Sequence, residues 1–144
     1  MVYLKKPSYR KGRLIILKAL KNILVCVTQQ KTCERLILSS NEYRTDPESE
    51  LFVLHVAKND WNFLDNAKEG EALEYLFKIS KTAGANMTVI KSDTIADTIA
   101  EFAQKNHIGI IVMGASPETR HENNFFDELQ NILPDVKICI IPQT

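Results

Sequence analysis

The residues best placed for chemistry follow apolar runs of the kind that form buried strands. Residues 110–113 are uncharged and mostly β-branched, and Gly114 follows them directly. In an open parallel α/β sheet, ligands bind outside the carboxyl ends of the strands, and a glycine there lets the backbone approach a bound group closely. The sequence therefore predicts a ligand cleft lined by Thr28, Gln29, Val56, Gly114, Ala115 and Ser116.

Candidate catalytic and metal-binding groups are sparse. The histidines, His55, His107 and His121, show neither the HxxxH nor the HxxE spacing that a zinc site on a helix needs. Ser116 sits as in half of a nucleophile elbow, but Glu118 stands where that motif needs its second glycine. We therefore predict no catalytic residue, no metal site and no enzyme activity, with slow nucleotide hydrolysis left open.

The cysteines and the hydropathy pattern favour a reducing compartment. The chain has three cysteines, an odd number without CxxC spacing, so they cannot form a closed disulfide set. Cys26 and Cys139 lie inside apolar runs, where a thiol behaves as a small buried hydrophobic group. No apolar run approaches the roughly 18 residues that span a bilayer, and the basic start lacks a signal-peptide cleavage site. We expect a cytoplasmic protein without a transmembrane segment.

Charge divides the chain into two parts. Residues 1–21 contain seven of the 18 basic residues and no acidic residue, whereas the remaining 11 basic residues are outnumbered by all 18 acidic ones. We predict a basic amino-terminal extension over residues 1–21 and one domain over residues 22–144. The extension is expected to be a short helix, an added strand or a linker. An acidic domain lacks the broad basic surface of nucleic-acid-binding proteins, so we expect no nucleic-acid partner.

Strand-like and helix-like patterns alternate through the domain. Strands are predicted at residues 23–27, 51–56, 87–90, 109–113 and 136–141. Between them, helices are predicted to be capped by Thr32 and by Ser92 or Asp93, and Phe77 is expected to face the core. Strands that alternate with helices favour right-handed crossovers. The predicted fold is α/β, an open parallel five-stranded sheet with helices on both faces.

The order of these patterns resembles universal stress protein domains. The residues that carry the likeness are Ile23-Leu-Val-Cys-Val, Leu51-Phe-Val-Leu-His-Val, Asp93-Thr-Ile-Ala-Asp-Thr-Ile-Ala-Glu-Phe-Ala and Ile110-Ile-Val-Met-Gly-Ala-Ser. The resemblance runs from about residue 21 to residue 142 and implies a three-layer fold of that family. Within it, the Val-Cys-Val strand and the Gly-Ala-Ser-Pro loop are most similar to the domain embedded in KdpD-type potassium-sensing histidine kinases.

The sequence departs from the family's nucleotide-binding pattern. The resemblance implies an aspartate after the first strand, which is Thr28 here, and a Gly-x2-Gly-x9-Gly-Ser/Thr loop that begins at Gly114. Pro117 then replaces the second glycine, while Asp127 and Glu128 replace the third glycine and the hydroxyl residue. Proline has no N–H to donate, and two carboxylates repel a triphosphate. We therefore expect no bound ATP cofactor.

Two functions follow from these departures. The first is a non-enzymatic regulatory module that acts through homodimerisation and contacts with a signalling protein. Its dimer interface would be the last strand, where Ile138 and Ile140 lie on an exposed sheet edge. The alternative is a sensor of ATP, AMP or a cyclic dinucleotide, either standing alone or as part of a KdpD-like kinase.

Overall fold

The computed structural model describes residues 21–27, 30–44, 48–57, 67–114 and 123–141. Five parallel strands form one sheet in the order β3-β2-β1-β4-β5. The strands are β1 (Asn22–Cys26), β2 (Leu51–Ala57), β3 (Ala85–Lys91), β4 (Ile108–Gly114) and β5 (Lys137–Ile141). The helices are α2 (Gln30–Ser40), α3 (Ala67–Thr82), α4 (Ile95–Lys105) and α6 (Asn123–Ile132), with a short 3-10 turn, η2 (Asn41–Tyr43).

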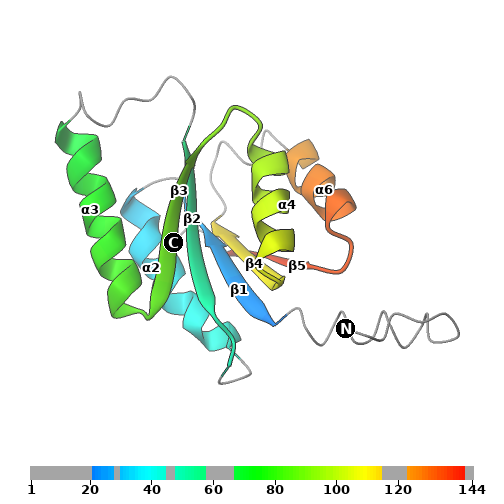
Figure 1. Cartoon of the computed structure of the whole chain (residues 1–144), viewed down its shortest axis with the longest axis horizontal. Helices are drawn as coiled ribbons and strands as arrows, with labels where there is room; N and C mark the ends of the chain where they lie inside the picture. The colour runs from blue at the N-terminus through cyan, green and yellow to red at the C-terminus, as the bar shows by residue number, and fades with distance from the viewer. Residues whose placement is uncertain (1–20, 28–29, 45–47, 58–66, 115–122, 142–144) are drawn as a thin grey trace, which may run out of the picture.

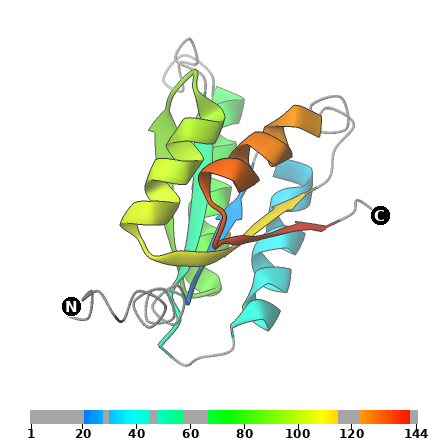
Figure 2. The ribbon, with the colours of Figure 1, turned by 90° about the vertical axis from the view of Figure 1, so that its right-hand side faces the viewer.

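The helices cover both faces of the sheet. Helices α2 and α3 lie on one face, and α4 and α6 lie on the other (Figure 1). A view turned by 90° shows α4 and α6 side by side in front of the strands (Figure 2). This arrangement confirms the predicted α/β fold, in which each helix links two parallel strands.

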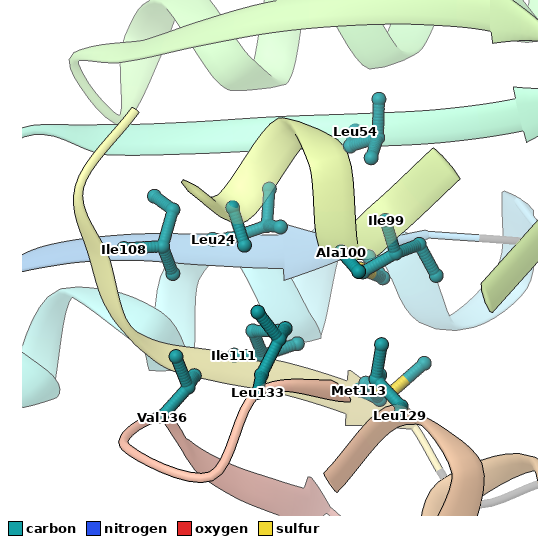
Figure 3. Close-up of a cluster of buried hydrophobic side chains, with 12 residues drawn as sticks. Leu24, Leu54, Ile99, Ala100, Ile108, Ile111, Met113, Leu129, Leu133 and Val136 are labelled. Atoms are coloured by element: carbon teal, nitrogen blue, oxygen red, sulfur yellow. The ribbon is translucent and has the colours of Figure 1, made fainter. Parts of the chain in front are cut away.

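Each central strand contributes to two cores because both of its faces are covered. In β1, Leu24 and Cys26 pack toward α4 and α6, whereas Ile23 and Val25 pack toward α2 and α3. Figure 3 shows the first core, in which side chains from the strands meet Ile99 of α4 and Leu129 of α6. Burial on both faces explains why these strands are continuous apolar runs in the sequence.

At the amino end of the sheet, the side chain of Asn22 forms hydrogen bonds to two neighbouring connections. Asn22 donates from its Nδ2 to the Asn106 carbonyl oxygen at 2.8 Å, and its Oδ1 accepts from the Glu50 N–H at 3.0 Å. Its own backbone N–H donates to the carbonyl oxygen of His107 at 3.3 Å. His107 has a φ of 53° and follows the end of α4, a position where left-handed backbone is common. Asn22 therefore joins the connections that enter β2 and β4.

Three local predictions were wrong. Thr32 lies inside α2, which begins at Gln30, so it does not cap that helix. Thr94, not Ser92 or Asp93, occupies the N-cap position of α4. Ser92 lies two residues before it, and its hydroxyl oxygen accepts a hydrogen bond from the Thr94 N–H at 3.1 Å. Phe77 is 48% exposed although Leu76 beside it is buried. Helix α3 lies over the edge of the sheet, so its buried stripe is narrow.

Candidate functional site

The candidate site is the point at the carboxyl end of the sheet where the strand connections diverge. The chain leaves β1 toward α2 on one face, whereas it leaves β4 toward α6 on the opposite face. Strands β1 and β4 are neighbours in the sheet, and Cys26 pairs with Met113 near their ends. Ligand crevices of open α/β sheets form at such switch points.

The structure describes two of the six predicted cleft residues. Val56 and Gly114 lie on β2 and β4, the two strands that flank β1. Val56 is half-buried and packs against the core under α4 and α6. Thr28, Gln29, Ala115 and Ser116 lie outside the described residues, as does Pro117.

Gly114 has a packing role that the sequence analysis did not anticipate. A Cβ at this position would lie 3.1 Å from Cδ1 of Leu36, which projects from α2 and is buried. This is closer than ordinary van der Waals contact, so the glycine allows α2 to pack tightly against the end of β4. Packing against Leu36 is therefore one reason for a glycine at this position.

His55 is a second unanticipated feature of the carboxyl end. Its side chain is buried, and its Nδ1 lies 2.9 Å from the carbonyl oxygen of Val27. Because a carbonyl oxygen can only accept, His55 must donate from Nδ1. The Val27 N–H in turn donates to the Leu54 carbonyl oxygen at 3.0 Å. A lone histidine within an apolar run was the available signal, since a buried polar group needs a partner.

Cys26 is a buried thiol near the carboxyl end of β1. The thiol is buried in the core beneath α4 and α6, and burial raises its pKa to about 12. A neutral thiol is a poor nucleophile and a poor metal ligand. Cys26 therefore behaves as the small hydrophobic group that the sequence predicted, whereas Cys139 on β5 is half-buried.

The acidic pair of the altered nucleotide pattern lies on the surface. Asp127 and Glu128 are both exposed on α6, whereas Leu129 beside them is fully buried. Among the residues that the structure describes, no group of three or more His, Cys, Asp and Glu side chains could hold a metal ion. Within the same residues, no helix is both long and apolar enough to cross a membrane.

Comparisons with known proteins identify the fold. No protein-family model and no curated protein sequence matches the chain. A solved structure of hypothetical protein MJ0577 is similar, with 18% identity, a TM-score of 0.62, and coverage of 88% of this chain and 98% of that one.

Two further structures carry the universal stress protein name. One, from Burkholderia pseudomallei, has 14% identity and a TM-score of 0.58 over 86% of this chain and 98% of that one. The other, from Archaeoglobus fulgidus in complex with dAMP, has 17% identity and a TM-score of 0.54 over 84% and 95%. At these identities the likeness establishes the fold, which is that of universal stress proteins.

Proposed function

We propose that the chain is a non-enzymatic regulatory module of universal stress protein type, which works in the cytoplasm by pairing with a second copy and contacting a signalling protein. The observation that carries this proposal is the exposed apolar surface of β5. Ile140 is 40% exposed on this edge strand, and Ile138 is only half-buried. The module would either stand alone or be part of a sensor kinase of KdpD type.

The β5 edge has the features of a pairing surface. Its five residues pair with β4, and β5 is the last strand in the order of the sheet. An edge strand that carries apolar side chains is a template for another strand unless a charge, a proline or a bulge blocks it. The single charged residue of β5, Lys137, lies at its start, so the rest of the strand is open to pairing.

The test is the mass of Ile140→Lys in light scattering, at dilutions where the wild-type mass no longer changes with concentration. We expect a dimer for the wild-type protein and a monomer for Ile140→Lys, because a charge blocks edge-to-edge pairing. Leu38→Lys is the matched control, since Leu38 is 48% exposed but lies on α2. An unchanged mass for Ile140→Lys would reject this interface.

A second candidate is an adenine-nucleotide sensor. The divergence of the connections after β1 and β4 favours it, as does the similar fold of the Archaeoglobus fulgidus protein in complex with dAMP. Thermal melting with ATP, AMP, dAMP and a cyclic dinucleotide separates the candidates, with GTP as the control. A ligand at about 100 times its Kd adds about 2.7 kcal/mol of stability. The regulatory proposal expects no adenine-specific shift.

A further inference from the structure

Strand β3 forms the opposite edge of the sheet (Figure 1). All seven of its residues pair with β2, yet none is buried. The N–H of Ser92 donates to the Ala57 carbonyl oxygen of β2 at 2.8 Å. Because the backbone groups of successive strand residues point to alternate sides, this bond fixes which groups point away from β2. These are the groups of Ala85, Met87, Val89 and Lys91.

An apolar flank borders this edge on the α3 side. Tyr75 of α3 donates from its hydroxyl to the Glu34 carboxylate of α2, so Tyr75 marks the flank of α3 that faces α2. Phe77 lies two residues further on, about 200° around the helix, and therefore on the flank away from α2. Its side chain is 48% exposed, and Met87 on the same face of the sheet is half-buried. A strand beside β3 would cover both side chains.

A hollow borders the same edge on the α4 side. It has a volume of about 420 Å³ and lies between β3 and α4. Thr88 and Ile90 of β3 line it together with Phe102, Glu101 and Lys105 of α4. Side chains of a strand beside β3 would therefore meet a partly apolar surface on this face as well.

We propose that β3 pairs antiparallel with β3 of a second copy, around a two-fold axis at Thr88. This register places Met87 opposite Val89 of the partner subunit, and both residues have their backbone groups pointing outward. They can exchange both hydrogen bonds, as directly opposite residues of an antiparallel ladder do. Thr88 then faces Thr88 of the partner subunit as a non-hydrogen-bonded pair, with Cα atoms about 4.5 Å apart.

Charge and side-chain pairing fit a second copy of this chain. In this register Lys91 lies opposite Ala85 of the partner subunit, and the two Lys91 Cα atoms are roughly 20 Å apart along the strands. A parallel pairing would align the two lysines. The register also creates two apolar Met–Val pairs beside Phe77 and a Thr–Thr pair on the other face, which are favourable cross-strand combinations. It brings Ile90 of the partner subunit toward the hollow.

Cysteine cross-linking of the full chain tests both the pairing and its register. Cys33→Ser and Cys139→Ser provide the background, in which the buried Cys26 is retained. Thr88→Cys is expected to form a disulfide-linked dimer under mild oxidation at least about tenfold faster than Asn86→Cys, because only position 88 faces itself within disulfide reach. Asn86→Cys mixed with Ile90→Cys should cross-link, whereas neither should do so alone.

Val89→Pro is the matched disrupting variant. The Val89 N–H points away from β2, so proline removes an outward donor and leaves the ladder with β2 intact. In the Thr88→Cys protein it should reduce cross-linking to the level of Asn86→Cys, with a cooperative melt that shows the fold is kept. Equal cross-linking rates at positions 86, 88 and 90 would overturn the proposal. So would a disulfide from position 88 to a cysteine at Ile15 of the same chain, since the edge would then be covered by the amino-terminal extension.

The test is independent of the β5 interface. Thr88→Cys should still cross-link when combined with Ile140→Lys, which is designed to remove pairing at β5. Loss of cross-linking in that combination would overturn the β3 proposal. An unchanged mass when Ile140→Lys is added to the Val89→Pro protein, in which β3 cannot pair, rejects only the β5 interface. Two different two-fold interfaces at opposite edges of the sheet link copies into an open chain, so the mass of the wild-type protein should rise with concentration beyond a dimer.

Discussion

The two ends of the sheet are held together by different physical means. At the amino end, the side chain and backbone of Asn22 make polar bonds to the connections that enter β2 and β4. At the carboxyl end, the side chain of Leu36 lies against Gly114, and the buried side chain of His55 donates to the Val27 carbonyl oxygen. Near the end at which ligands bind in open α/β sheets, Gly114 therefore contributes to the packing of α2 against β4.

The largest loss of stability is expected from substitutions at the contact between Leu36 and Gly114. Leu36→Ala should lower the free energy of unfolding by about 2 to 5 kcal/mol, because it deletes a buried side chain between α2 and β4. Gly114→Val should cost about 1 to 3 kcal/mol through overpacking against Leu36. In urea unfolding, the double variant should lose less than the sum of the two. Strict additivity would show that Gly114 and Leu36 are not coupled.

A smaller loss of stability is expected from substitutions of Asn22 at the amino end of the sheet. Asn22→Ala removes the side-chain partner of the Glu50 N–H and of the Asn106 carbonyl oxygen, and water can replace that partner in part because the two bonds are exposed and half-buried. The free energy of unfolding should therefore fall by about 0.5 to 1.5 kcal/mol. Asn22→Asp is the comparison variant, since it keeps the acceptor for Glu50 but loses the donor to Asn106. If both variants unfold at the same urea concentration as the wild-type protein, the hydrogen bonds of the Asn22 side chain contribute nothing measurable to the free energy of unfolding.

The third prediction concerns the buried thiol of Cys26. An unfolded Cys26 thiol ionises near pH 9.0, while burial keeps the native thiol neutral up to a pKa of about 12. Between these values the unfolded state loses the proton that the native state retains. The free energy of unfolding should therefore fall as the pH rises through this range, by up to about 1.4 kcal/mol per pH unit. The effect should fade as the pH drops below 9, where the unfolded thiol is protonated as well.

Cys26→Ala isolates this contribution from other titrating groups. Its stability relative to the wild-type protein, measured by urea unfolding at pH 8 and again at pH 10.5, should improve at the higher pH. A constant difference between the two proteins would show that the native thiol ionises as readily as the unfolded one.

The sequence predicts the fold well because both faces of the sheet are buried. Uninterrupted apolar runs mark the strands, and Gly84 ends α3 as expected, with a φ of 73°. Phe77 was wrongly predicted to face the core because its exposure depends on the position of α3 over an edge of the sheet. The periodicity of apolar residues carries no information about that position. Helix starts were misplaced by one to three residues because several polar residues near each start can act as caps.

The candidate site was less predictable because it is made by contacts between distant segments. Gly114 could be recognised as the residue after a strand, but Leu36, which explains it, belongs to a helix much earlier in the chain. His55 likewise finds its partner, Val27, on the neighbouring strand. Neither contact leaves a local pattern in the sequence, so spacing alone could not predict that Gly114 packs against α2.

The central position of β1 has a consequence for synthesis of the chain. Strand β1 is made first, and it pairs with β2 on one side soon afterward. Its other side pairs with β4, which ends only at Gly114. While the intervening residues are being translated, the nascent half-sheet exposes an apolar strand edge that will later lie at the centre of the molecule. Such edges are prone to misassociation, so we expect chaperone binding to be greatest before β4 emerges from the ribosome.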